Sequence, residues 1–467
     1  MTDDLVYWPV TKLVGAYRRK KASPVEVMRA VLARIDRLNG TVNAICHLDR
    51  DGAIKAAKQS ERRWAKGRPL GPLDGIPVTA KDTLHIKGMP TRWGSPLSDP
   101  APQTEDSAAL ARLRESGAVL FGKNTCPEYG TGPVTINPLT GITRNPWNLT
   151  RTSGGSSGGA ASAVAAGFGP MAIGTDAGGS IRIPCSFTGL VGLKTTLGLV
   201  PVYPPMVAPL LSTTGSIART VDDAAYILNV IRRRDGRDFQ ELPPTADDYG
   251  KGIGKGVKGL RVAFSLTLGY AAKVDDEVAK IVTEAAYSFR KLGARVEARD
   301  PGFENPNAIV RTFVNVGVAY RTRHGHGQMA SMGDNLKASV EAGLKASAID
   351  YATAFDQRAK LHAHMAAFHE KYDLLITPTL AVAAFPAERW FPEEFAQFNN
   401  IRAWLPFTNP FSLSQQPAIT IPCGFTREGL PVGLQIVGPK YADALVLRAA
   451  KAYESANDWK DRRPALD

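Results

Sequence analysis

Two short segments rich in glycine and serine restrict the fold of this chain more than any other feature. Thr152–Gly159 reads TSGGSSGG, and Gly174–Arg182 reads GTDAGGSIR. Glycines at this density cost backbone entropy, so they indicate positive φ angles or a close approach to another group. An apolar run separates the two segments, and Gly178-Gly179-Ser180 would follow a strand. We therefore expect both loops to converge on one reacting atom, with backbone N–H groups directed into one concavity, as an oxyanion hole requires.

The sequence around these segments predicts the α/β class. Short apolar runs at 76–78 and 171–173 are typical of buried strands, and a helix at 107–116 leads into a strand at 118–121. This alternation favours a sheet covered by helices on both faces. The later elements are expected as follows: strands at 260–264, 374–376 and 418–421, and a mainly helical part from 275 to 372.

Two helices are expected before the sheet begins. Ser23-Pro24-Val25-Glu26 combines a capping box with proline at the first helical position, and a second helix spans 53–66. The G-x-G-x-x-G pattern at 254–259 lacks the preceding strand that a dinucleotide site needs. Since the strand follows the glycines, we interpret 235–259 as a polar loop.

Composition and charge argue against several classes of protein. The 467 residues carry a net charge of +13, but the basic residues are scattered, which disfavours nucleic acid as a partner. Four cysteines lie far apart without a C-x-x-C pattern, as in reduced cytosolic proteins. The N-terminus lacks the apolar core of a signal peptide, and no apolar run reaches the ~20 residues of a membrane span. We expect a cytoplasmic protein that does not bind membranes.

A serine nucleophile needs a base, and histidine is poorly placed to supply it. His47 and His85 are isolated, and the other five histidines lie far downstream, at 324–369. Lys81 follows a predicted buried strand, where burial would lower its pKa and let the neutral amine accept a proton. An ordinary lysine at a strand end remains the alternative at this point.

Together these motifs resemble the amidase signature family. The similarity includes GIPVTAKD at 75–82, both glycine-rich segments and the run from Cys185 to Lys194. It continues through TTGSIART at 213–220 to PAITIPCG at 417–424 and LPVGLQIVG at 430–438. The motifs thus extend over most of the chain in the family's order and spacing.

The resemblance implies a catalytic role for three residues. Ser180 would be the nucleophile, Ser156 would follow a cis peptide bond and relay the proton, and neutral Lys81 would be the final base. The oxyanion hole would be formed by the backbone N–H groups of Ala177, Gly178, Gly179 and Ser180.

The surroundings of these residues are also implied. Asp176 and Arg182 would pair behind the catalytic loop, and Ser157 would hydrogen-bond in the same network. The substrate pocket is assigned to Tyr129, Thr131, Gly132, Trp404 and Phe407. Apart from Arg389 and Arg402 that part of the sequence offers no obvious charged group. It therefore favours a neutral aryl or alkyl amide, with esters or carbamates as further substrates.

The family's architecture predicts a single large domain over 1–467, with a mixed, twisted central sheet covered by helices on both faces. Its parts would be N-terminal helices (1–66), a catalytic core (67–220), a more variable, mainly helical part (235–400) and a return to the sheet (405–455). The implied mechanism needs no metal and no cofactor. The expected binding partner is a small amide substrate, and the sequence is compatible with a homodimer.

Two other kinds of hydrolase compete with this interpretation. GGSSG at 154–158 matches the nucleophile elbow of α/β-hydrolases, but the loop-like run 145–152 precedes it where that motif needs a strand. A metal site is the second alternative, and its ligands would be His324, His326, His362 and His369. No acidic residue stands at ligand spacing from these histidines, so the metal site is disfavoured.

The glutaminase subunit of a tRNA-dependent amidotransferase is the third alternative, and the basic charge keeps it open. Those subunits carry an acid that orients glutamine where Leu405 stands here. Ser412 replaces a frequent asparagine, and Asn124-Thr125 reverses the usual order. These departures affect substrate binding only, so hydrolysis of simple amides by the chain alone would separate the two functions. A pure binding protein is disfavoured because all three catalytic residues are present.

Overall fold

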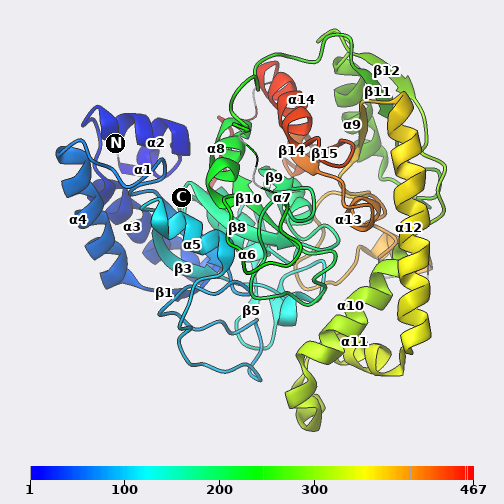
Figure 1. Cartoon of the computed structure of the whole chain (residues 1–467), viewed down its shortest axis with the longest axis horizontal. Helices are drawn as coiled ribbons and strands as arrows, with labels where there is room; N and C mark the ends of the chain where they lie inside the picture. The colour runs from blue at the N-terminus through cyan, green and yellow to red at the C-terminus, as the bar shows by residue number, and fades with distance from the viewer. Residues whose placement is uncertain are drawn as a thin grey trace.

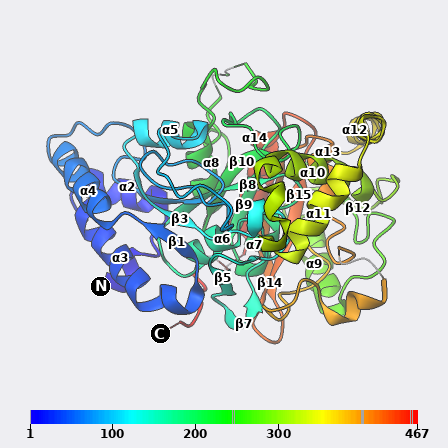
Figure 2. The same ribbon diagram turned by 90° about the horizontal axis from the view of Figure 1, so that it is seen from below.

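A mixed sheet forms the centre of the computed structural model, and helices cover both of its faces (Figures 1 and 2). The structure describes residues 2–243, 245, 247–398, 402–457, 459 and 461–466. Within these residues the sheet has eleven strands, in the order β1-β3-β2-β8-β10-β9-β14-β15-β13-β11-β12. The expected α/β fold is therefore confirmed.

The strands of the main sheet are β1 (Ile45–Leu48), β2 (Pro77–Lys81), β3 (Val119–Asn124), β8 (Met171–Asp176), β9 (Val191–Lys194), β10 (Thr213–Ala218), β11 (Arg261–Phe264), β12 (Arg295–Ala298), β13 (Leu374–Pro378), β14 (Ala418–Phe425) and β15 (Pro431–Val437). Two small ribbons pair β4 (Ile136–Asn137) with β5 (Gly141–Ile142) and β6 (Arg144–Asn145) with β7 (Asn148–Thr152). In the main sheet β2 runs parallel to both β3 and β8, whereas β8 to β13 are joined by antiparallel pairs.

The α-helices are α1 (Thr2–Leu5), α2 (Val10–Arg18), α3 (Pro24–Val42), α4 (Arg50–Ala65), α5 (Ala108–Glu115), α6 (Gly158–Ala165), α7 (Arg182–Thr188), α8 (Val221–Ile231), α9 (Asp276–Ser288), α10 (Asn307–Arg321), α11 (Asp334–Lys345), α12 (Ala348–Lys371), α13 (Asn409–Leu413) and α14 (Asp443–Ser455). Short 3₁₀ segments occur at η1 (Glu128–Gly130), η2 (Arg323–Ser331) and η3 (Glu393–Phe398). No helix of the described part of the chain is long and apolar enough to span a membrane.

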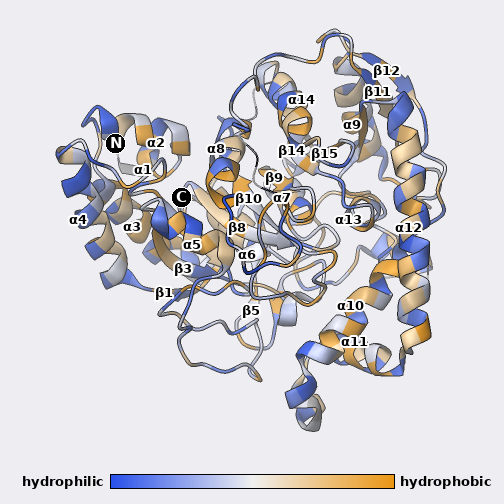
Figure 3. Ribbon diagram, viewed as in Figure 1, coloured by the Kyte–Doolittle hydropathy of each residue, from blue (hydrophilic) through white to orange (hydrophobic). Residues whose placement is uncertain are grey.

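Alternating residues of the central strands face two different layers of helices. In β8, Ala172 packs with α6 and α7, whereas Met171 and Ile173 belong to the large core on the other face, which includes α8, α9 and α14. Successive side chains of a strand point to opposite faces, so a sheet buried on both sides needs apolar residues at every position. Figure 3 shows this: the central strands are hydrophobic, while outer helices such as α4 and α12 mix both kinds of residue.

The capping box at Ser23 is confirmed, and other boundaries differ slightly from expectation. Ser23 Oγ accepts the Glu26 N–H at 3.0 Å, and Glu26 Oε2 accepts the Ser23 N–H at 3.4 Å. The second helix begins at Arg50, earlier than expected. The mainly helical part contains the strand β12, which the sequence analysis missed because its RVEA sequence buries a single side chain. The glycines at 254–259 lie in a loop before β11, as expected.

Replacing Ser23 by alanine removes the acceptor for the Glu26 N–H at the start of α3. We expect the free energy of unfolding to fall by about 1 kcal/mol, the usual cost of losing an N-cap. Urea unfolding of Ser23→Ala and of Lys21→Ala, an exposed neighbour outside the cap, gives the comparison. Equal stability of the two variants would show that the cap contributes nothing.

Candidate active site

The two glycine-rich segments and Lys81 meet at one edge of the sheet. Lys81 is the last residue of β2, and β8 beside it ends at Asp176. Because β2 and β8 are parallel, their carboxyl ends lie together. The loop after β8 holds Ser180, and Ser156 lies in the loop just before α6. The expected convergence of the two loops is therefore present.

Lys81 contacts hydroxyl groups in a buried setting. Its Nζ lies 2.6 Å from Ser156 Oγ and 2.9 Å from Thr175 Oγ1. The peptide bond between Gly155 and Ser156 is cis. Only 2% of Lys81 is exposed, and burial lowers the pKa of its amine to about 8. Thr175 is a contact that the sequence analysis missed, although it directly precedes Asp176.

Ser180 lines the same cavity as Lys81 and Ser156. This cavity measures about 60 Å³. The two loops are also joined through their backbones, since the Ser157 N–H donates to Ser180 O at 3.0 Å. Ser157 Oγ contacts both the N–H and the carbonyl of Thr175 at 3.3 Å, so this side chain lies in the network as expected.

The backbone N–H groups of the Ser180 loop divide into two kinds. Within the described residues, no hydrogen-bond acceptor contacts the N–H of Ala177, Gly178 or Ser180. The N–H of Gly179 donates to Asp176 Oδ1 at 2.7 Å, which corrects its expected place in the oxyanion hole. Gly179 has a φ of +124°, and an added Cβ would come within 2.4 Å of Thr408 Oγ1. Glycine is required there because a side chain would clash with Thr408, and the Gly179 N–H ties the loop to the end of β8.

Asp176 and Arg182 form the expected buried pair. Arg182 Nη2 lies 2.9 Å from Asp176 Oδ1, and both side chains are fully buried. Burial raises the pKa of Asp176, but the Arg182 charge and hydrogen bonds outweigh it and bring the value to about 2. The guanidinium also donates to three groups from distant segments, Thr408 O, Gln435 Oε1 and Ser412 Oγ.

The structure corrects much of the predicted substrate pocket. Tyr129 and Thr131 line the cavity, as expected. Trp404 and Phe407 do not, because both are fully buried in an aromatic core with Phe187 and Phe385. Gly132 lies against Trp390, whose ring an added Cβ would meet at 2.7 Å. Besides Thr175, the missed lining residues are Thr83, Trp93, Gly130, Met206, Val207, Ala208, Ser212 and Val314.

The downstream histidines whose side chains are described do not form a cluster. His362, His364 and His369 each contact a different backbone carbonyl, of Ser414, Pro301 and Tyr372 respectively. The side chain of His326 lies outside the described residues. Among the residues whose side chains are described, no three His, Cys, Asp or Glu are grouped as metal ligands would be.

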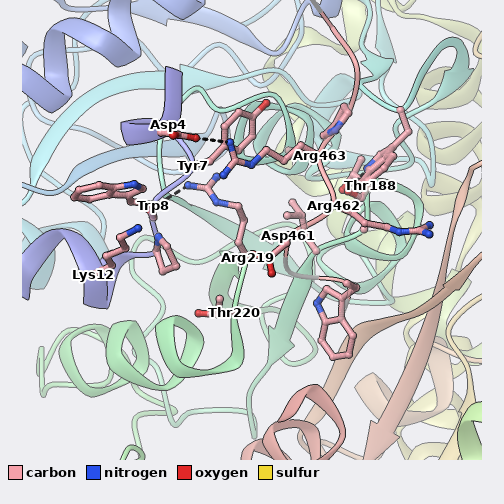
Figure 4. Close-up of a pocket in the computed structure, with 17 residues that line it drawn as sticks. Asp4, Tyr7, Trp8, Lys12, Thr188, Arg219, Thr220, Asp461, Arg462 and Arg463 are labelled. Atoms are coloured by element: carbon pink, nitrogen blue, oxygen red, sulfur yellow. Dashed lines mark hydrogen bonds and ion pairs between the residues drawn. The ribbon is translucent and has the colours of Figure 1, made fainter. Parts of the chain in front are cut away.

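A larger cavity of about 260 Å³ lies apart from the serines, between the first helices and the C-terminal tail (Figure 4). In Figure 4 Arg219 and Arg463 lie beside the Tyr7 ring. Arg463 pairs with Asp4 at 3.0 Å, and Arg219 donates to the carbonyls of Val6, Trp8, Val164 and Gly169. These bonds join the two ends of the chain to the sheet, and the cavity shares no lining residue with the one that Ser180 lines.

Comparison with known proteins identifies the family. The amidase family profile matches residues 26–447. The chain belongs to the amidase signature family. The acylamidase of Rhodococcus erythropolis is 36% identical over 100% of this chain and 99% of its own length. A glutamyl-tRNA(Gln) amidotransferase subunit of Gloeobacter violaceus is 34% identical over 96% of each chain.

Solved structures of the amidase signature family resemble this one throughout. A bacterial aryl acylamidase superposes with a TM-score of 0.89 at 28% identity and 97% coverage of each chain. A 6-aminohexanoate cyclic dimer hydrolase gives the same TM-score and identity with 99% coverage of each. Like its family, this protein is a hydrolase that acts on amide bonds.

Replacing Arg182 by methionine leaves the Asp176 carboxylate buried without its cation. Removing one member of a buried ion pair costs about 3–5 kcal/mol, so we expect a loss of that size in the free energy of unfolding. Arg389→Met is the control, because Arg389 forms a surface pair with Glu393 that is worth about 1 kcal/mol or less. Urea unfolding measures both, and similar small losses would contradict a structural role for the buried pair.

Proposed function

We propose that this amidase cleaves its substrate through an acyl-enzyme on Ser180, with Ser156 as proton relay and Lys81 as base. The observation that carries the proposal is the 2.6 Å contact between Lys81 Nζ and Ser156 Oγ in a cavity that Ser180 also lines. A buried amine whose pKa is about 8 is partly neutral near physiological pH, so it has a lone pair to accept a proton.

The proposed proton path runs from Ser180 through Ser156 to Lys81. Ser180 Oγ attacks the amide carbon while its proton passes to Ser156 Oγ, and the Ser156 proton passes to Lys81 Nζ. The oxyanion is stabilised by the uncommitted N–H groups of residues 177, 178 and 180. The path then reverses to protonate the leaving amine, and water repeats the sequence to release the acid.

We further propose a neutral aryl or alkyl acyl group in place of glutamine. Leu405, which stands where amidotransferase subunits carry an acid, is 2% exposed and packs in the aromatic core. The cavity wall is largely apolar, with Trp93, Met206 and Val314 among its residues. The similarity to an acylamidase and to an aryl acylamidase supports this choice. The four cysteines form no disulfide, which supports a reducing, cytoplasmic compartment.

Ser180→Ala removes the proposed nucleophile and should lower kcat for an aryl amide by about three orders of magnitude or more. A fluorophosphonate probe should add its mass to the peptide that contains Ser180. Ser186→Ala is the control, since Ser186 is buried on α7 outside the cavity. Labelling at Ser156, together with an active Ser180→Ala variant, would contradict the proposed roles.

The pKa of Lys81 predicts a dependence of activity on pH. Below a pH of about 8 the amine is mostly protonated and does not accept a proton, so kcat/KM should rise with pH and level off above that value. Lys81→Met should lose this rise along with most of the activity, whereas Lys87→Met, on the exposed surface, should keep both. An unchanged profile in Lys81→Met would assign the rise to another group.

A further inference from the structure

Arg321 lies at the end of the helix that forms one wall of the catalytic cavity. Val314 of α10 lines the cavity, and Arg321 follows it by seven residues on the same helix. Residues seven apart share a helix face and are separated by roughly 10 Å along the axis. The guanidinium of Arg321 lies 4.7 Å from the centre of the Trp93 ring, and Trp93 also lines the cavity.

The Trp93 ring beneath Arg321 is fixed in a stack with Tyr129. Trp93 and Tyr129 stack with their ring centres 5.9 Å apart, and the Tyr129 N–H donates to Trp93 O at 2.8 Å. Both residues have a positive φ, of +53° and +52°, which is unfavourable for bulky side chains and persists where the surroundings enforce it. Glu128 supplies part of that enforcement, because it accepts hydrogen bonds from Ser95 Oγ at 2.6 Å and from the Gly333 N–H at 2.9 Å.

Among the described residues, the charge of Arg321 has no carboxylate partner. No hydrogen-bond acceptor or carboxylate contacts its guanidinium within the described residues. Burial is the main cause that lowers the pKa of Arg321, and the charged groups that shift this pKa, Tyr129, Arg323 and Tyr320, include no carboxylate. A guanidinium presents five N–H donors in one plane, and these match a carboxylate in two-point geometry.

We propose that Arg321, with the Trp93–Tyr129 stack, selects amides whose leaving arylamine carries a carboxylate on the ring. The ring lies against the aromatic surface, and the guanidinium binds the carboxylate beyond it. This inference rests on the proposed function, in which the acyl group of the substrate is neutral. The ring that carries the carboxylate must therefore belong to the leaving amine. Arg321 acts in selection and takes no part in bond cleavage.

The test compares 4-acetamidobenzoate with 4-acetamidotoluene, which differ in carrying a carboxylate or a methyl group at one ring position. We measure kcat/KM for both substrates with the wild type and with Arg321→Met. For each protein the selectivity is the value for 4-acetamidobenzoate divided by the value for 4-acetamidotoluene, and the wild-type selectivity is then divided by that of the variant. Intrinsic differences in reactivity cancel in this quotient. A charge-assisted hydrogen bond predicts a quotient of about tenfold or more in favour of the wild type.

Two further variants distinguish a role of Arg321 in substrate selection from a role in holding the Trp93 ring in place. Arg321→Lys keeps the charge but loses the planar fork, so its selectivity should lie between those of the wild type and Arg321→Met. Arg323→Met is the matched control, because Arg323 is exposed and its guanidinium bonds to Tyr320 O at 3.0 Å and stacks on the Tyr320 ring. Its selectivity should equal that of the wild type.

A quotient within about twofold of unity would overturn the inference and leave Arg321 a structural role beside Trp93. Calorimetric binding of 4-acetamidobenzoate to Ser180→Ala, with and without Arg321→Met, tests recognition without turnover. Loss of binding on removal of Arg321 supports the inference even if the wild type cleaves neither amide, a result that would contradict the proposed function alone. Equal binding by both proteins would contradict the inference alone.

Discussion

The edge of the sheet at which Lys81, Ser156 and Ser180 meet depends on the buried pair of Asp176 and Arg182. A charge inside a protein is tolerated only when it is paired and fully hydrogen-bonded, and this pair meets both conditions. Asp176 accepts the N–H groups of Gly179 and Ile181 and so fixes the turn that carries Ser180. Arg182 extends the same constraint to α13 and β15 through Ser412 and Gln435. Segments more than two hundred residues apart are thereby held around one turn.

Two buried lysines on neighbouring strands of the sheet differ in the groups that contact their amines. Lys123 on β3 lies 3.0 Å from the Asp82 carboxylate, which stabilises its charge. Lys81 on the neighbouring strand contacts the uncharged hydroxyls of Ser156 and Thr175. Hydroxyl groups accept a hydrogen bond from an ammonium group and donate one to an amine, so they suit either protonation state. The choice of partner therefore separates a structural lysine from one suited to proton transfer.

The sequence predicted which segments meet at this edge of the sheet, because each segment is a local motif. Lys81, Ser156 and Ser180 each lie in a contiguous motif, and the strands before them are continuous apolar runs. The wall of the cavity is different, because Trp93 and Val314 come together only through tertiary packing. Trp404 and Phe407 were wrongly assigned to it, since an aromatic residue in a core and one in a pocket have the same sequence signature.

The hydrogen bonds of the Glu128 carboxylate have a consequence for how such enzymes diversify. This carboxylate joins the strained turn at Tyr129 to Gly333, the residue just before α11, and Asn335 Nδ2 of that helix donates to Thr131 O. The helical pair α10–α11 thus shapes the cavity while making no bond to Lys81, Ser156 or Ser180 in the described structure. Mutation, insertion or exchange of this hairpin offers evolution a route to new substrates that leaves the inherited chemistry unaltered.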